Sequence, residues 1–114
     1  MKYVIIAGGY NDKSATLADI TSGMSDCKTI VASKFPNATM CVAFIGTSTN
    51  ASTQTQLATA KQNYASAATS LSVTTLNYTD TLTASDIASD GIHPNDKGEQ
   101  KIAKGIVTAM NNQL

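Results

Sequence analysis

Charged residues are scarce in this sequence. They make up 14% of its 114 residues, and eight basic residues balance eight acidic ones to give a formal net charge of zero. An average globular protein has roughly a quarter of its residues charged. A nucleic-acid-binding protein needs a basic face to displace counterions from phosphates, so no nucleic-acid partner is expected. No apolar run reaches the roughly 18 residues of a membrane-spanning helix, and no membrane span is expected.

Tryptophan is absent, and cysteine and histidine are rare. Cys27 and Cys41 have no metal-ligand spacing and are predicted to be small buried side chains rather than a disulfide. No metal and no organic cofactor is expected. The apolar share, 42%, is that of a folded protein, and we predict one partial domain over residues 1–114. The apolar run at the N-terminus is too short for a signal peptide, and the localisation stays open.

Three short runs of apolar, often β-branched residues predict strands. They are Tyr3–Ala7, Met40–Ile45 and a weaker one at Val73–Leu76. The second run is unbroken, which is typical of a strand covered on both faces.

Helical periodicity fills the segments between and after these strands. The first helix has a capping box at Thr16 and Asp19 and ends before Pro36; the second begins near Ser52. The polar connection Asn77–Asn95 leads to a last helix with a capping-box-like start at Asp96 and Glu99. The faces predicted to be buried are Leu17, Ile20, Met24, Cys27 and Val31 in the first helix, and Ile102, Ile106, Ala109 and Met110 in the last.

Strands that alternate with helices indicate an α/β fold. We predict a three-layer α/β/α architecture with a parallel sheet of about three strands. In open sheets of this kind, ligands bind at the carboxyl ends of the strands. Two polar segments are expected at that edge, one directly after the first strand and one before the last helix.

The first segment is Gly8-Gly9-Tyr10-Asn11-Asp12. An Asn amide at the end of a strand can donate a hydrogen bond to a developing oxyanion. The alternative is a plain turn, in which Asn11 and Asp12 have Asx-turn or capping roles. A P-loop is excluded because Asp12, not Gly, precedes Lys13-Ser14, and the G-x-G-x-x-G spacing of dinucleotide sites is absent.

The second segment is Asp90-Gly91-Ile92-His93-Pro94, which contains the single histidine. A lone histidine is more often structural than catalytic. A carboxylate three residues away can nevertheless bind one imidazole nitrogen, set the tautomer and stabilise the imidazolium that forms on proton abstraction. Asp90 and His93 are therefore candidates for an acid–base pair.

Taken together, the two segments resemble conserved blocks of the SGNH/GDSL hydrolases. Gly9-Tyr10-Asn11-Asp12 is similar to the G-x-N-D block of that family, and Asp90–His93 is similar to its D-x-x-H block, in the same order and about 80 residues apart. The resemblance implies a flavodoxin-like SGNH fold. It also implies Asn11 as oxyanion donor, Gly9 as the residue that permits its turn, and His93 as general base oriented by Asp90. Tyr10 would line the substrate cleft, and Asp12 would hold the loop.

The resemblance fails at the nucleophile. The family's first block, Gly-Asp-Ser after a first strand, occurs nowhere in the sequence. Ser14 and Ser89 stand in the wrong context to replace it. By this comparison the chain is truncated and lacks two strands of the family's sheet. Strand Tyr3–Ala7 is then expected to pair with a second copy of the chain or with the missing N-terminal segment.

The expected function is that of the C-terminal part of a serine esterase acting on acyl esters of carbohydrates or lipids, inactive by itself. The alternative is a non-catalytic carbohydrate-binding or structural module derived from the same fold. The Ser/Thr-rich, weakly charged composition is similar to that of bacterial cell-surface and phage-tail proteins. A third interpretation, an unrelated flavodoxin-like module with chance motifs, predicts that Asn11 and His93 lie far apart.

Overall fold

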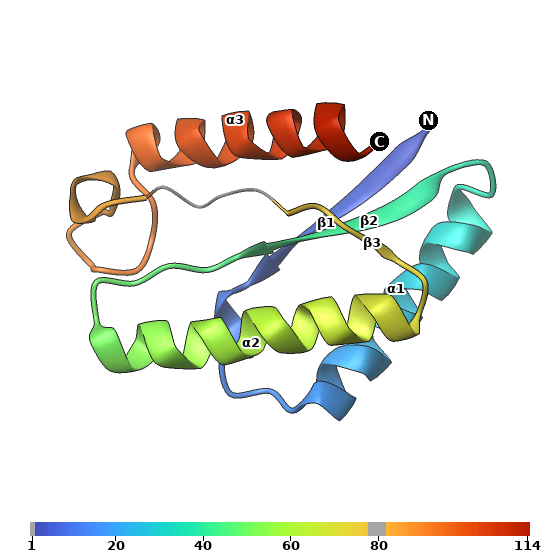
Figure 1. Cartoon of the computed structure of the whole chain (residues 1–114), viewed down its shortest axis with the longest axis horizontal. Helices are drawn as coiled ribbons and strands as arrows, with labels where there is room; N and C mark the ends of the chain where they lie inside the picture. Colours follow the sequence, from blue (N-terminus) through green and yellow to red (C-terminus); the bar gives the residue numbers. More distant parts are fainter. Residues whose placement is uncertain (1, 78–81) are drawn as a thin grey trace.

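The computed structural model describes residues 2–77 and 82–114. Figure 1 shows the course of the chain through its strands and helices. In chain order the elements are β1 (Tyr3–Gly9), η1 (Tyr10–Asp12), α1 (Leu17–Lys34), β2 (Thr39–Ile45), α2 (Ala51–Ser70), β3 (Thr74–Thr75), η2 (Ala84–Asp86) and α3 (Asp96–Gln113), where η marks a single 3₁₀ turn.

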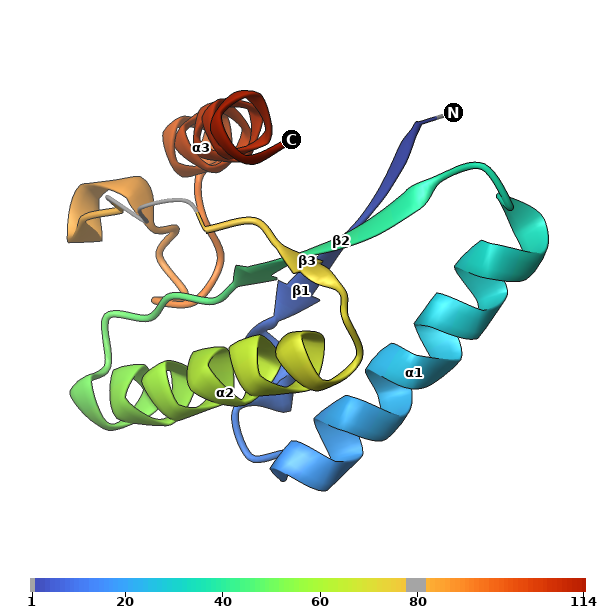
Figure 2. The same cartoon turned by 45° about the vertical axis from the view of Figure 1, so that its right-hand side comes forward.

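The three strands form one parallel sheet with β2 in the centre. α1 and α2 cover one face of this sheet and α3 covers the other, as the two views in Figures 1 and 2 show. The predicted three-layer α/β/α fold with a parallel sheet is confirmed. β2 is buried along nearly its whole length because helices cover both of its faces.

The core divides into two main clusters, because successive side chains of a strand point to opposite faces. Met40 and Val42 of β2 pack toward α1 and α2, whereas Cys41 and Ala43 pack toward α3. The buried helical partners are Ile20, Met24, Val31, Ala67 and Ala68 on the first face and Ile102 and Ala109 on the second.

The start of α1 follows the predicted capping box. The Thr16 backbone N–H donates to Asp19 Oδ2 (3.1 Å), and the Asp19 N–H donates to Thr16 Oγ1 (3.2 Å). These two bonds satisfy backbone donors that the first turn of a helix leaves without partners. The Thr16 hydroxyl, which donates to Asp19 Oδ2 (2.6 Å), and then the Thr16 N–H lower the pKa of Asp19. Leu17, predicted to be on the buried face, is instead 43% exposed, because it lies one turn before the first core residue of α1, Ile20.

The predicted start of α3 is wrong in its capping residue. Asn95, not Asp96, caps the helix, because its Oδ1 accepts from the backbone N–H groups of Lys97 and Gly98 (3.1 Å each). The predicted connection Asn77–Asn95 also contains more structure than expected. Apart from positions 78–81, which lie outside the described residues, it holds η2 and an antiparallel bridge between Ile87 and Pro94.

The third strand is shorter than the predicted Val73–Leu76. Leu76 still donates its N–H to Val42 O (2.8 Å), but the chain then turns toward α3. There the Gln113 side chain bonds both the N–H and the C=O of Asn77, at 3.2 and 3.1 Å. A side-chain amide thus replaces the strand neighbour that would have extended β3.

The first strand lies at the edge of the sheet. Tyr3–Ile6 are only partly buried and Ala7 is exposed, whereas β2 is buried nearly throughout. The difference arises because β1 pairs with β2 on one side only.

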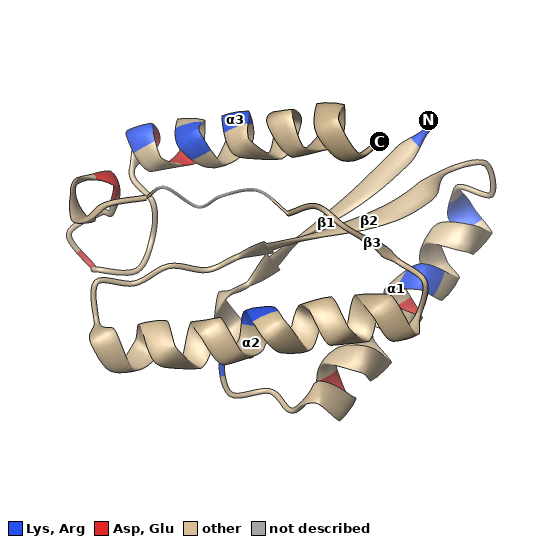
Figure 3. Ribbon diagram, viewed as in Figure 1, with Lys and Arg blue, Asp and Glu red and all other residues tan. Residues whose placement is uncertain are grey.

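Charged residues are absent from the three strands and are most frequent at the start of α3. Figure 3 shows lysines and acidic residues interspersed along the first half of α3 and only scattered charges elsewhere. Among the described residues, no helix combines the length and the hydropathy that a membrane span requires.

Candidate functional site

The two predicted segments meet at the carboxyl end of the sheet. A pocket of about 180 Å³ opens there between the end of β1, the loop after β2 and the loop before α3. Asn11 and His93 both line it. The other lining residues are Tyr10, Ile45, Gly46, Thr47, Ile92 and Pro94. A module with chance motifs would have left Asn11 and His93 far apart, and the structure has them in the same pocket.

Gly9 gives the chain its sharp turn out of β1. Its φ is +132°, a conformation that residues with a side chain rarely adopt. A Cβ atom at this position would also lie 2.3 Å from Cε2 of Phe44. Both observations require glycine where β1 gives way to the turn that carries Asn11.

Asp12 ties this turn to α2. The Tyr64 hydroxyl donates to Asp12 Oδ2 (2.5 Å), and the Tyr64 ring packs edge-to-face on Phe44 with ring centroids 5.3 Å apart. Burial and the bond to Asp12 raise the pKa of Tyr64 well above its usual range. Tyr64 therefore remains a neutral hydrogen-bond donor. The turn that carries Asn11 is fixed before it by the packing of Gly9 on Phe44 and after it by the bond from Tyr64 to Asp12.

Tyr10 belongs to the same turn and is half-buried against the core cluster of Phe44, Leu57 and Ala60. Its ring lines the pocket, and the Lys13 ammonium group stands 4.7 Å from the ring centroid. A cation over an exposed aromatic face contributes about 0.5–1 kcal/mol, so the pair is a modest restraint on the ring.

Asp90 and His93 form a direct side-chain pair. Asp90 Oδ2 lies 2.5 Å from His93 Nδ1, and Asp90 Oδ1 accepts the backbone N–H groups of Ile92 (2.9 Å) and His93 (3.0 Å). The imidazole bond, and then the two amides, lower the pKa of Asp90 to about 2. With Nδ1 occupied by a carboxylate, Nε2 is the imidazole nitrogen that remains to exchange a proton.

The pair is open to solvent. The side chains of His93 and Asp90 are 75% and 45% exposed. A base in this position is accessible to a reacting group but is not shielded from water, so the site as it stands has no covered reaction chamber.

The loop that carries His93 is fastened to the loop after β2 through one carbonyl group. The Gly91 C=O accepts the Thr49 N–H (3.1 Å) and the Ser48 hydroxyl (3.3 Å), and Ser48 is almost fully buried. Gly91 has a φ of +72°, and a Cβ there would lie 2.8 Å from Thr49 Oγ1. Sequence reasoning missed Ser48 and Thr49; the available signal was a polar run directly after a central strand.

A larger cavity of about 270 Å³ lies elsewhere, between α1 and the sheet. Its lining is mainly apolar; Ile6, Met24, Cys27 and Met40 are among the lining residues, and Asp12 is the only one of the six predicted site residues that reaches it. Because it contains neither His93 nor Asn11, we take the smaller pocket as the candidate site. In the described part of the chain, no three His, Cys, Asp or Glu side chains gather as metal ligands.

Comparison of the chain with protein-family models, with curated proteins and with solved structures found no match. The resemblance to the SGNH/GDSL hydrolases therefore rests on the two motifs and their setting. The roles assigned to Asn11, Asp90 and His93 stay predictions.

Proposed function

We propose that this chain carries the acid–base half of an SGNH/GDSL-type serine ester hydrolase. The observation that carries the proposal is that Asn11 and His93, about 80 residues apart in sequence, line one pocket while Asp90 binds His93 Nδ1. An amide donor, an imidazole and an orienting carboxylate are three of the groups that acyl transfer through a serine needs.

The reaction would use each group at a defined atom. Nε2 of His93 would take the proton of a serine hydroxyl as its oxygen attacks the ester carbonyl carbon. The Asn11 amide would donate to the oxyanion, and Asp90 would stabilise the imidazolium. Nε2–H would then protonate the departing alcohol, and water, activated by the same nitrogen, would release the acid from the acyl-serine.

The serine itself has to come from outside these 114 residues. No Gly-Asp-Ser block occurs in the sequence, and neither Ser14 nor Ser89 is among the residues that line the pocket. The chain by itself is therefore proposed to be inactive. We propose an acyl ester of a carbohydrate or a lipid as the substrate. Of the eight residues that line the pocket, only His93 and Tyr10 have an ionisable side chain.

The test is to extend the chain with the coding sequence that precedes it and to measure p-nitrophenyl acetate hydrolysis. If a Gly-Asp-Ser block is present, turnover should appear and should fall about 10⁴-fold or more in its Ser→Ala variant and in His93→Ala, because nucleophile and base act as a unit. Ser14→Ala and Ser89→Ala are the matched controls and should retain turnover. An extended chain that binds carbohydrate but hydrolyses no ester would favour the non-catalytic module instead.

A further inference from the structure

Asp86 is a fully buried carboxylate at the end of η2. Its Oδ2 accepts from the Thr83 backbone N–H (2.8 Å), the Thr83 hydroxyl (2.9 Å) and the Lys101 ammonium group (2.6 Å). Its Oδ1 has no hydrogen-bond partner among the described residues; the Lys97 ammonium group is 3.7 Å away. Lys101 supplies the main compensation for a charge that would otherwise be costly to bury, and it lowers the pKa of Asp86.

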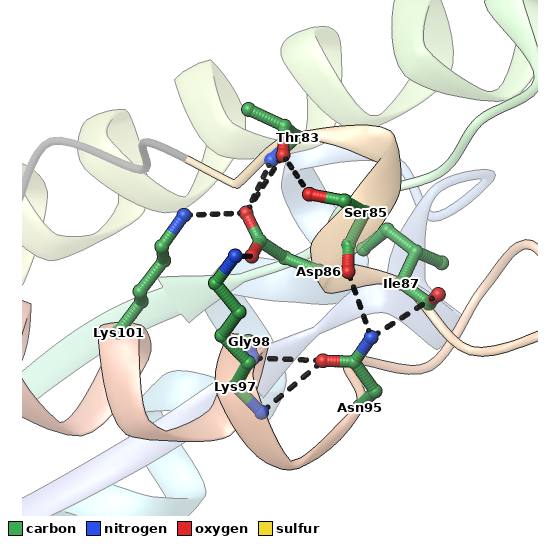
Figure 4. Close-up of polar contacts among 8 residues, drawn as sticks. All are labelled: Thr83, Ser85, Asp86, Ile87, Asn95, Lys97, Gly98 and Lys101. Carbon is green, nitrogen blue, oxygen red and sulfur yellow. Dashed lines mark hydrogen bonds and ion pairs between the residues drawn. The ribbon is translucent and has the colours of Figure 1, made fainter.

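The Asp86 turn is packed directly on the first turn of α3. The Asp86 C=O accepts the Asn95 N–H (2.9 Å), and a Cβ at position 98 would lie 2.3 Å from the same oxygen. The Asn95 amide also donates to Ser85 O (3.0 Å) while its Oδ1 caps α3. Figure 4 shows the Asn95 side chain between η2 and the first turn of α3, with Lys101 reaching Asp86 from α3.

The same segment holds the backbone of His93. Pro94 forms the antiparallel bridge with Ile87, and the Ala88 N–H donates to His93 O (2.7 Å). His93 thus lies in a bend, next to the isolated bridge that joins its loop to the residue after Asp86. Displacing η2 from α3 would shift the loop from which the imidazole reaches Asp90 and the pocket.

We propose that the buried Asp86–Lys101 ion pair is a positioning device for His93, locking η2 onto α3 and so setting the place of the imidazole in the pocket. The inference goes beyond the proposed function and depends on it only in the choice of His93 as the group that matters. Asp86 touches neither His93 nor the pocket, so it is a positioning residue and not a catalytic one.

The test uses the full 114-residue chain, Lys101→Met and Lys104→Met. Lys104 lies three residues further along α3 and makes no ion pair with a described residue, so it is the matched control. Amide hydrogen exchange of Ala88 and Asn95 and the imidazole NMR signals of His93 are recorded for each variant. In Lys101→Met, exchange at both amides should rise roughly tenfold or more and the His93 Nδ1 signal should lose its Asp90-bonded character, while Val42 exchanges as before. Lys104→Met should match the parent.

Two further variants separate charge from general destabilisation. Asp86→Asn combined with Lys101→Met leaves no charge unpaired, so exchange at the two amides should be slower than in Lys101→Met; it should stay faster than in the parent because the ion pair is absent, and full recovery of the parent rates and His93 signals would overturn the proposal. Thr83→Val removes one donor to the same carboxylate and should speed exchange at the same two amides about three- to fivefold, so the proposal stays testable if Lys101→Met does not fold.

The proposal is overturned if Lys101→Met and Thr83→Val leave the Ala88 and Asn95 amides and the His93 signals unchanged. It is also overturned if exchange rises by the same factor at Val42, which would mean that the ion pair stabilises the whole fold and not this segment. Because no readout involves ester turnover, a failure of the esterase proposal would leave these outcomes interpretable.

Discussion

Replacing Gly9 with alanine should destabilise the protein strongly. An L-residue at the Gly9 φ of +132° is strained, and left-handed conformations cost about 1–2 kcal/mol per residue. The new Cβ would lie 2.3 Å from Cε2 and 2.4 Å from Cδ2 of Phe44, so the ring has to move. Forcing a methyl group into a packed core costs about 1–3 kcal/mol. The expected loss in the free energy of unfolding is therefore about 2–5 kcal/mol.

Gly8→Ala is the matched control. It adds the same methyl group one residue earlier in the same strand, where no heavy atom lies within 4 Å of the new Cβ and φ is not positive. Its free energy of unfolding should stay unchanged or rise by up to about 1 kcal/mol, because alanine narrows the unfolded ensemble.

Urea unfolding followed by far-ultraviolet circular dichroism measures both variants on one scale. The midpoint of Gly9→Ala should fall with little change in the slope m, since the surface exposed on unfolding is nearly the same. Substitutions at surface sites without special contacts usually change the free energy of unfolding by less than about 0.5 kcal/mol. If the free energies of unfolding of Gly9→Ala and Gly8→Ala differ by no more than this, the turn at Gly9 or its packing on Phe44 is not as described.

Three other predictions concern the site, its pH dependence and the open edge of the sheet. The 114-residue chain should hydrolyse p-nitrophenyl acetate no faster than free imidazole at the same concentration, because a base without a nucleophile leaves only imidazole background; turnover far above that rate and lost in His93→Ala would contradict this. The Asp90 pKa, about 2 in the folded chain and 3.8 ordinarily, implies stabilisation that is complete above pH 3.8 and is lost as the pH falls from 3.8 through 2. Urea unfolding at pH 2–5 should thus show a flatter pH dependence for Asp90→Asn, and an unchanged slope would refute it. Light scattering should detect self-association through β1, which Ala7→Lys should reduce by charging its edge; a stable monomer at high concentration would count against this.

Elements that depend on local sequence patterns could be predicted. The apolar run of β2 and the Thr16–Asp19 box are contained within a few residues, and the structure has both. The end of β3 could not be read in this way, because it depends on Gln113, which lies 36 residues after Asn77. The cap of α3 could not be read locally either, because the amide nitrogen of Asn95 also donates to the carbonyl groups of Ser85 in η2 and of Ile87, eight to ten residues earlier.

The residues that hold the candidate site in place could not be predicted from the sequence for the same reason. Ser48 and Thr49 are more than forty residues away from Gly91 in the sequence, and no pattern of apolar and polar residues predicts a contact between them. Asp86 is a carboxylate in a polar connection, which ordinarily means exposure to solvent. Its burial depends on Lys101, fifteen residues further on.

The loop around His93 combines side-chain anchors at Asp86, Asp90 and Asn95 with main-chain hydrogen bonds whose register depends on the number of residues in the loop. Gly91 O, His93 O and Asp86 O each accept a hydrogen bond from a backbone N–H group. Exchanging the side chain of Ala88 or Ser89 would leave these main-chain bonds in place, whereas Asp90 and Gly91 have to be kept. A single inserted or deleted residue, however, would shift the register, so that the N–H groups no longer face the carbonyl groups of Asp86, Gly91 and His93. Variant libraries of this loop should change the side chains that make no such contact and should keep the number of residues constant.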